Sequence, residues 1–379
     1  MKKIKIAHVL HSIGGVEVYL DLVIKNIDSN TIENIIIHGE KEKVKEYFNI
    51  SKQPVKQFFI PIKREINVIN DIRCIYQTIK ILKKEKPNII HAHSAKGGII
   101  ARIASLFYKV NVLHTPHAYS YLSSNSQIKR FIFLKIEKIF KNFNSILLAT
   151  SESELNRGIK EVGYSVSRAL LFNNSIKPIL AKEKNTSIIS SLPENYICTV
   201  GRPSYQKNIE MMVKIIKEVK KTIPDIHLVV MGLGVVSPNT ENVKRLIVEY
   251  KLEENTTLIE WIEREKIFDI VKNSKFYIST ARYEGLPYAI IESLALKKSL
   301  IASDCDGNKD LVKNNYNGYL ININEIDLFV EKVIELYNNT ELREKFENNS
   351  FIFFEENFNL NINIKCLEKI YIKYSNLNK

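Results

Sequence analysis

The chain has 379 residues, of which 45% are hydrophobic and 26% are charged. Single hydrophobic cores stop growing at about 250–300 residues, so this length predicts two domains, and the ordinary composition excludes a disordered or fibrous chain. The net charge is +13: residues 1–180 hold 28 Lys and Arg against 14 Asp and Glu, whereas residues 181–379 hold 27 against 28. A basic first half indicates an acidic partner such as an anionic membrane or a nucleic acid, although lysines spread over a solvated surface give the same count.

Cysteine usage and hydropathy exclude further classes. No C-x-x-C pair occurs, so we expect neither a disulfide framework nor a cysteine zinc site. This cysteine usage fits a protein of the reducing cytosol. The start of the chain is lysine-rich, but its apolar run is broken by Lys5 and His8, which indicates a strand and not a signal peptide. No apolar run approaches the roughly 18 residues of a spanning helix, so a cytoplasmic protein with at most peripheral contact to the inner face of the membrane is expected.

Short apolar runs alternate with helical patterns from the first residues, which is typical of βαβ units and a parallel sheet. The strands expected in the first half are residues 4–9, 34–38, 58–60, 88–91, 110–114, 145–149 and 169–172. The helices expected between them include residues 16–27, 66–84, 97–107 and 152–162. The polar stretch 173–193 then interrupts this alternation, and we place a linker there.

The alternation resumes in the second half, which predicts a second α/β sheet. Its expected strands are residues 196–200, 226–231, 257–259, 276–279, 299–302 and 318–320. Its expected helices are residues 208–221, 240–250 and 287–296. Open α/β sheets bind ligands beyond the carboxyl ends of their strands, so the loops from strand to helix are the candidate sites.

The first such loop, residues 11–17, carries the pair Gly14 and Gly15. Paired glycines let the backbone approach a ligand closely, and the helix that follows offers N–H groups to an anion such as a diphosphate, although a tight turn alone would also explain them. The chain has no G-x-x-x-x-G-K-[ST], so a P-loop nucleotidase is excluded. Gly232-Leu233-Gly234 lacks the third glycine of a dinucleotide fingerprint.

The second loop, Gly201–Asn208, follows the first strand of the second half. Arg202 offers a fork for two phosphate oxygens and Lys207 offers a point charge, so the two together suit a leaving diphosphate. Such a pair is ordinary on a surface, but its place between a strand and a helix favours a phosphate site.

The third loop holds two carboxylates that frame a helix start. Pro287 suits the first helical position, which places Glu284 before the helix and Glu292 inside it. Glu284 could simply complement the helix dipole and Glu292 could be an exposed helix carboxylate. However, Glu292 lies in an apolar stretch where a carboxylate needs a partner, and a ribose diol would be one.

At these residues the chain resembles the retaining glycosyltransferases of family four, also called glycosyl transferases group 1, of the kind that builds bacterial surface polysaccharides. The resemblance rests on the Gly-Arg-x4-Lys-Asn segment at 201–208 and the Glu-Gly-x-Pro-x4-Glu segment at 284–292. It implies the α/β GT-B fold, in which two Rossmann-like domains face a central cleft. We expect an acceptor-side domain of residues 1–175, completed by a C-terminal helix at about 357–379, and a donor-binding domain of residues 190–356.

The resemblance also implies roles for individual residues. Donor binding would fall to Gly14, Gly15, Arg202, Lys207, Glu284, Gly285, Leu286, Pro287 and Glu292. Arg202 and Lys207 would hold the diphosphate, Glu284 the hydroxyls of the transferred sugar, and Glu292 the ribose. Asp310 stands where the family commonly has a glutamate, which leaves its role open, and the nucleobase would meet backbone near residues 260–262.

The catalytic residues implied by the resemblance are His117, Arg202, Lys207 and Glu284. His117, and not His114, matches the family histidine beside the donor sugar. His91 and His93 form a His-x-His pair at a strand end that suits zinc, but the fold normally works without metal, so we expect no metal and no cofactor besides the nucleotide-sugar donor. Since the chain shows no nucleophile set, we expect electrostatic stabilisation of the departing diphosphate and, by resemblance, retention of configuration.

Residues 127–141 predict a basic helix that bears on the acceptor. Ile128, Ile132, Ile136, Ile139 and Phe140 share one stripe that can face the core, while Phe131, Phe133 and Leu134 fall among the lysines. Packing against a neighbouring element would explain such a helix, and so would an anionic bilayer surface. The second interpretation favours transfer to a lipid-linked saccharide in surface polysaccharide biosynthesis, for which we expect a UDP-sugar as the donor.

Other functions stay open at this point. They are a glycosyltransferase with a soluble acceptor and a UDP-sugar epimerase or hydrolase of the same fold, which would turn over its donor without any acceptor. A nucleic-acid partner is not expected, because no recognition helix, stacking motif or zinc knuckle accompanies the basic charge.

Overall fold

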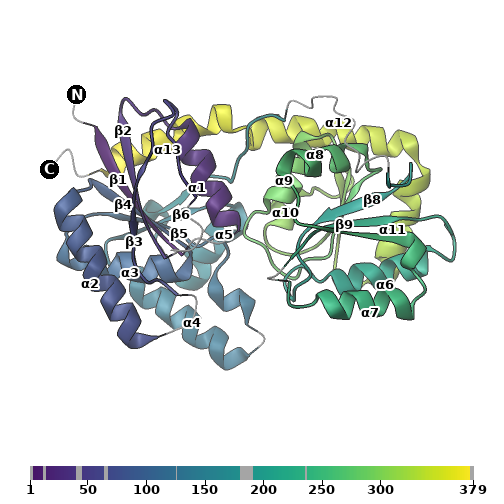
Figure 1. Ribbon diagram of the computed structural model, residues 1–379, viewed down its shortest axis with the longest axis horizontal. Helices are drawn as coiled ribbons and strands as arrows, with labels where there is room; N and C mark the ends of the chain where they lie inside the picture. Colours follow the sequence, from purple (N-terminus) through teal and green to yellow (C-terminus); the bar gives the residue numbers. More distant parts are fainter. Residues whose placement is uncertain are drawn as a thin grey trace. The chain divides into compact units, whose positions relative to one another are not determined.

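The computed structural model describes residues 3–11, 14–39, 45–63, 67–124, 126–179, 191–234 and 237–375. The chain forms two compact units, the first made of Met1–Asn174 with Leu360–Lys379 and the second of Ser175–Asn359. Each unit is a parallel β-sheet covered by helices on both faces (Figure 1). This architecture confirms the expected pair of Rossmann-like domains.

The first unit is built on a seven-stranded sheet of order β3-β2-β1-β4-β5-β6-β7. Its strands are β1 (Ile4–Leu10), β2 (Ile32–His38), β3 (Lys56–Phe59), β4 (Ile89–His93), β5 (Val112–Thr115), β6 (Ser145–Ala149) and β7 (Ala169–Leu171). The central strands β1 and β4 pair in parallel with His8 opposite His91. Because side chains alternate along a strand, these two histidines point to the same face.

Helices cover both faces of this sheet. They are α1 (Gly15–Asn26), α2 (Val68–Glu85), α3 (Ser94–Phe107), α4 (Gln127–Phe140), α5 (Glu152–Arg157) and α13 (Leu360–Tyr374), with short turns η1 (Ser120–Ser123), η2 (Gly158–Val162) and η3 (Val166–Arg168). Ala7 and Val9 of β1 pack with the α2 and α3 side chains, whereas Leu10 packs with α1 on the opposite face. The α1 face also receives α13 from the end of the chain (Figure 1). The histidines of β1 and β4 therefore lie in the layer between the sheet and the helices α1 and α13.

The second unit is built on a six-stranded parallel sheet of order β10-β9-β8-β11-β12-β13. Its strands are β8 (Ile197–Val200), β9 (Leu228–Leu233), β10 (Thr256–Glu260), β11 (Tyr277–Ser279), β12 (Leu300–Ser303) and β13 (Gly318–Ile321). Its helices are α6 (Ile209–Val219), α7 (Thr240–Glu249), α8 (Arg264–Asn273), α9 (Tyr288–Ala295), α10 (Asn308–Leu311), α11 (Ile326–Asn338) and α12 (Thr340–Asn357), with the turn η5 (Glu253–Asn255). The side chains of α6, α7 and α11 share one core with the sheet. Strands β8 and β11 are neighbours, so the loops that follow them start side by side.

The orientation of α4 differs from the expected one. Three isoleucines of the stripe predicted to face the core are exposed: Ile128, Ile132 and Ile139. Phe133 and Leu134 pack inward instead. The physical reason is a buried ion pair, because Arg102 Nη1 of α3 donates to Glu137 Oε2 at 2.9 Å and turns that side of α4 toward the protein. In the described part of the chain, no helix is long and apolar enough to cross a membrane.

Candidate functional site

The loops after β8 and β11 meet in an ion pair between Lys207 and Glu284. Lys207 Nζ lies 2.7 Å from Glu284 Oε1, and Gln206 Nε2 donates to Glu284 Oε2 at 3.1 Å. The Glu284 side chain is buried, whereas that of Lys207 keeps about a quarter of its surface exposed. The structure thus brings together two residues from separate predicted motifs and adds Gln206, which the sequence analysis had not singled out.

Backbone contacts fix the shape of the lysine loop. Arg282 N donates to Gln206 O at 2.8 Å, and Thr280 Oγ1 donates to Asn208 O at 2.9 Å, so the residues after β11 hold the end of the loop. Asn208 precedes α6 with a φ of 54°, the left-handed region that asparagine tolerates better than most residues. At Gly201 an added Cβ would lie 3.0 Å from Lys207 Cδ, so this glycine leaves room for the lysine stem.

The electrostatics of this pair favour a charged lysine. Desolvation is the largest single influence and lowers the pKa of Lys207, but the attraction and hydrogen bond of Glu284, with smaller contributions from Tyr277 and Cys305, together outweigh it and raise that pKa above its usual range. Arg202 lies earlier in the same loop and is half-buried. The loop after β8 therefore carries two cationic side chains, one of which contacts a buried carboxylate, a charge arrangement that suits an anionic ligand with hydroxyl groups.

Glu292 lies inside α9, which begins at Tyr288 with Pro287 as its N-cap, one residue later than expected. Its side chain is buried and accepts a hydrogen bond from Arg264 Nη2 at the start of α8. Desolvation raises the pKa of Glu292, and the neighbouring Arg264 guanidinium opposes that rise. The carboxylate thus has the partner that its apolar surroundings require, and sequence reasoning had not identified Arg264.

The residues after Glu284 are enclosed by a second loop of the same unit. Leu286 is buried, and Gly307 approaches Gly285 so closely that a Cβ at position 307 would lie 2.7 Å from Gly285 O. Gly307 also has a φ of 79°, so glycine is required there for two reasons. Asp310, in the short helix α10, follows this contact and is half-buried.

In the first unit, Gly14 and Gly15 stand where β1 gives way to α1. Gly14 has a φ of 63° and is the N-cap of α1, so its conformation favours glycine. An added Cβ at Gly14 or at Gly15 would meet nothing within 4 Å, which leaves open space beside the helix start. Ser12 and Ile13 of the same loop lie outside the described residues.

His117 lies in the loop after β5, on a backbone that a carboxylate holds. His117 and Ala118 both have positive φ, 53° and 78°, a conformation that costs free energy in residues other than glycine. Glu154 fixes this loop, because its Oε1 accepts from Ala118 N at 2.8 Å and its Oε2 accepts from Thr150 N at 2.7 Å. Nothing in the local sequence pattern identified Glu154, since its partners precede it by 36 and 4 residues along the chain.

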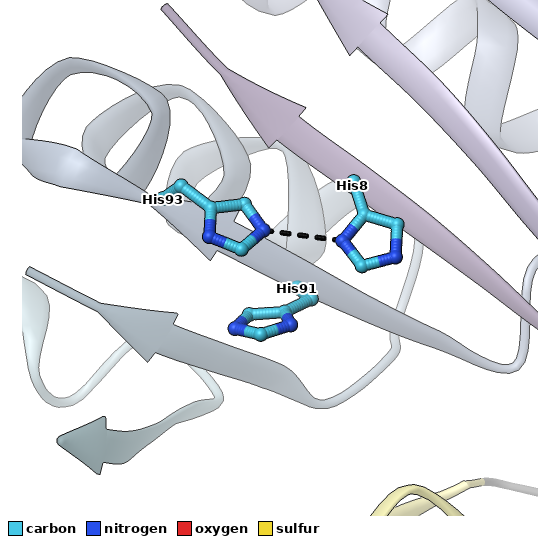
Figure 2. Close-up of side chains that lie close together, drawn as sticks. All are labelled: His8, His91 and His93. Atoms are coloured by element: carbon cyan, nitrogen blue, oxygen red, sulfur yellow. Dashed lines mark hydrogen bonds between the residues drawn. The ribbon is translucent and has the colours of Figure 1, made fainter. Parts of the chain in front are cut away.

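Four histidines meet on the α1 face of the first sheet. His8, His91 and His93 are fully buried, and His117 stacks on His93 with ring centroids 5.4 Å apart. Figure 2 shows the hydrogen bond between His8 and His93, with His91 beside them. His114 lies on the opposite face, where its Nε2 faces Gly98 of α3. The sequence analysis had named His91 and His93 but had missed His8, which the β1–β4 register brings beside them.

The three buried histidines could in principle hold a metal ion, because one ring nitrogen from each lies within 4.8 Å of the others. Every ring nitrogen of the three also has a hydrogen-bond partner within the protein. His91 forms hydrogen bonds with Tyr371 Oη at 2.7 Å and with Thr115 Oγ1 at 2.9 Å. His8 bonds to Asn34 and His93, and His93 bonds to His8 and His117. A metal would therefore have to replace hydrogen bonds that already satisfy these groups.

Comparison with known proteins gives the chain its family. Residues 13–177 match the family model Glycosyltransferase Family 4, and residues 182–352 match Glycosyl transferases group 1. The chain is 28% identical, over 88% of both chains, to an Escherichia coli UDP-Gal:alpha-D-GlcNAc-diphosphoundecaprenol alpha-1,3-galactosyltransferase. It is 24% identical to the Staphylococcus aureus capsular polysaccharide biosynthesis glycosyltransferase CapM, over 92% of this chain and 90% of CapM.

Solved structures share the fold over nearly the whole chain. Sucrose-phosphate synthase from Thermosynechococcus elongatus has a TM-score of 0.84 at 16% identity, covering 98% of this chain and 99% of that one. Anabaena HepE, solved in complex with UDP and glucose, has a TM-score of 0.79 at 14% identity and covers 98% of this chain and 100% of its own. With both halves matched in order, the chain belongs to the glycosyltransferases of group 1 and family 4 and has the GT-B fold.

Proposed function

We propose that this glycosyltransferase moves a sugar, with retention of configuration, from a UDP-sugar to a hydroxyl group of a lipid-linked saccharide during the assembly of a bacterial surface polysaccharide. The observation that carries the donor side is the Lys207–Glu284 ion pair at the adjoining ends of β8 and β11. The choice of UDP is supported by the UDP-Gal in the name of the Escherichia coli relative and by the UDP bound to HepE.

The donor-binding residues divide the nucleotide sugar between them. Lys207 and Arg202 neutralise the diphosphate, and Glu284 accepts hydrogen bonds from hydroxyls of the transferred sugar while Gln206 keeps its carboxylate in place. Glu292, which is buried and hydrogen-bonded to Arg264, accepts hydrogen bonds from the ribose hydroxyls. In the first unit, Gly14 and Gly15 leave open space beside the start of α1, whose backbone N–H groups suit an anionic group of the donor.

The chemistry proceeds by electrostatic stabilisation of the leaving group. As the bond from the anomeric carbon to the β-phosphate oxygen breaks, the electron pair leaves with the phosphate, and Lys207 and Arg202 stabilise the added negative charge. The acceptor hydroxyl attacks the same face of the sugar, and its proton passes to the departing phosphate oxygen. Neither step requires a metal ion, because the two cationic side chains supply the charge that a metal would otherwise supply.

The exposed side of α4 supports an acceptor held at a membrane. Ile128 is 73% exposed and Phe131 is 61% exposed, and Lys129, Arg130 and Lys135 are exposed on the same helix. Apolar and cationic side chains together suit the headgroup layer of an anionic bilayer, where the helix lies in the plane of the surface. The diphosphoundecaprenol in the name of the Escherichia coli relative supports the same class of acceptor.

A donor screen tests the proposed activity. Purified protein in EDTA is incubated with UDP-, GDP-, ADP- and TDP-sugars, and binding is followed by thermal shift and by the fluorescence of Trp261, the single tryptophan. We expect one UDP-sugar to bind and to be hydrolysed slowly, and Lys207→Ala and Glu284→Ala to lose both properties. Lys244→Ala, a change at an exposed lysine of α7, serves as the matched control. A requirement for added metal, or an altered free sugar as the product, would reject the proposal in favour of metal-dependent or epimerase chemistry.

A vesicle assay tests the membrane contact separately. Phe131→Ser should reduce binding to vesicles that contain anionic lipid, and high salt should reduce the binding of the unmodified protein. Val248→Ser removes an apolar side chain of similar exposure, 61%, from α7 of the second unit and should leave binding unchanged. Binding that is insensitive to both salt and Phe131→Ser would indicate a soluble acceptor.

A further inference from the structure

A continuous chain of hydrogen bonds leads from Asn34 of β2 to His117. His8 Nε2 lies 3.0 Å from Asn34 Oδ1, His8 Nδ1 lies 3.1 Å from His93 Nε2, and His93 Nδ1 lies 3.1 Å from His117 Nε2. This hydrogen-bond chain involves four strands or their ends, β2, β1, β4 and the loop after β5, and lies beneath α1. None of these contacts is needed to form the sheet, so the chain requires a separate explanation.

The amide oxygen of Asn34 gives this chain a direction. A neutral imidazole has one N–H and one lone pair, and an amide oxygen can only accept. His8 must therefore carry its proton on Nε2, which leaves Nδ1 to accept from His93 Nε2–H. By the same rule His93 Nδ1 accepts from His117 Nε2–H. The Nδ1 atom of His117 is then the end of the chain, and it holds a lone pair.

Burial keeps the three rings neutral, so that each has one N–H group and one lone pair. Desolvation lowers the pKa of His8 to about 4, although the hydrogen bond with Asn34 opposes this, and it lowers the pKa of His117 to about 3. Desolvation and neighbouring histidines also lower the pKa of His93 well below its usual value. At neutral pH each ring therefore has one proton, and the choice of nitrogen is set by hydrogen bonding.

We propose that Asn34, His8 and His93 are positioning residues that fix the tautomer of His117, so that its Nδ1 is an obligatory acceptor for a hydroxyl group of the substrate. His117 is half-buried, and within the described part of the chain its Nδ1 has no hydrogen-bond partner. The Glu154 carboxylate holds the backbone of the same loop, so the ring is fixed in position as well as in protonation. The role of the acceptor nitrogen rests on the proposed sugar transfer, whereas the tautomer itself does not.

The other histidine of this layer, His91, provides the comparison. His91 bonds to Thr115 Oγ1 and to Tyr371 Oη, and Thr115 Oγ1 donates its own proton to Leu148 O at 2.8 Å. His91 Nε2 therefore donates to Thr115, and Tyr371 donates to His91 Nδ1. This arrangement lies in the same layer but is separate from the chain that ends at His117. A change at Thr115 thus alters the histidine layer without removing a member of the hydrogen-bond chain that ends at His117.

Nuclear magnetic resonance reads the tautomers directly. The full chain is labelled with ¹⁵N-histidine, and long-range ¹H–¹⁵N correlation spectra are recorded in EDTA at neutral pH, with signals assigned from single His→Gln variants. We expect His8, His93 and His117 to be protonated on Nε2 and unprotonated on Nδ1. Protonation of His117 on Nδ1, or a mixture of tautomers, would overturn the proposal. Equimolar Zn²⁺ should leave the spectra unchanged, and shifts of His8 Nδ1 and His93 Nε2 would show a metal centre instead.

Two variants link the tautomer to function. Asn34→Ala removes the acceptor that sets the direction, so His117 should become a mixture of tautomers, and kcat/KM for the donor should fall about fivefold, the size expected for one neutral hydrogen bond. Thr115→Val should leave the His117 tautomer unchanged and alter kcat/KM by less than about twofold. An Asn34→Ala protein that keeps the unmodified tautomer at His117 would contradict the proposal. A normal tautomer pattern in a protein without donor turnover would reject the proposed function alone.

Discussion

Replacing Lys207 by methionine separates the structural and catalytic roles of its ion pair. The change keeps most of the apolar stem but removes the ammonium group, so the buried Glu284 carboxylate keeps only the hydrogen bond from Gln206. Removing one partner of a buried ion pair costs about 3–5 kcal/mol. Because the lysine side chain is about a quarter exposed, water replaces part of the interaction, and we expect about 2–3 kcal/mol.

The effect on turnover should be larger and should respond differently to a second change. Loss of one group that stabilises the developing negative charge lowers kcat by about 100- to 1,000-fold. Adding Glu284→Gln to Lys207→Met removes the uncompensated charge, so stability should recover by about 1–2 kcal/mol, with no recovery of kcat.

The assay is a double-mutant cycle. Urea unfolding followed by circular dichroism gives the free energies, and donor hydrolysis gives kcat. The 2.7 Å contact predicts that the two changes are coupled. A stability change in the double variant equal to the sum of the changes in the two single variants would refute this coupling. Recovery of kcat in the double variant would refute the role of Lys207 in stabilising the leaving group.

Three further predictions concern the first unit. Burial holds the pKa of His8 near 4, below its usual 6.5, so the unfolded chain binds more protons between these values. The His8 contribution to stability should be complete above about pH 6.5 and should fall by about 1.4 kcal/mol per pH unit toward pH 4, a loss that pH-dependent urea unfolding of the unmodified protein and His8→Gln would measure. Gly14→Ala should lower the free energy of unfolding by about 1 kcal/mol, because residue 14 has a positive φ. Gly15→Ala, at a position with open space around it, should leave the thermal midpoint of unfolding unchanged but should weaken donor binding in a titration. Glu137→Gln should cost about 3–5 kcal/mol in the same unfolding assay, because it leaves Arg102 buried without a countercharge, and a cost below 1 kcal/mol would contradict that pairing.

The fold class could be predicted from local patterns, because the alternation of short apolar runs with helical periods reflects which residues are buried. Sequence motifs also located Lys207 and Glu284, whose loops follow neighbouring strands. The helices α8 and α12 were not identified, since polar residues dominate their sequences, and the apolar helix α11 was missed as well. In α11 and α12, buried side chains such as Phe329 and Phe346 join the core of the second unit, and this tertiary packing stabilises a helix without leaving a clear signal in its local sequence.

Partners that come from distant parts of the chain could not be predicted. Arg264 reaches Glu292 from α8, Glu154 reaches the His117 loop from α5, and His8 joins His93 through strand register. Each contact depends on tertiary placement and leaves no local signal. The error at α4 has a related cause, because apolar residues were expected to face the core, whereas the buried Arg102–Glu137 pair decides which side faces inward.

The most direct test of the proposed activity is the transfer of a radiolabelled sugar from its UDP-sugar to lipid-extractable material in EDTA. Bacterial membranes supply the acceptor, and proton NMR reads the anomeric configuration of the product. We expect label in the lipid fraction, with the configuration of the donor, and no transfer by the Lys207→Met protein. Inverted configuration, transfer only after metal is added, or full transfer by Lys207→Met would contradict the account.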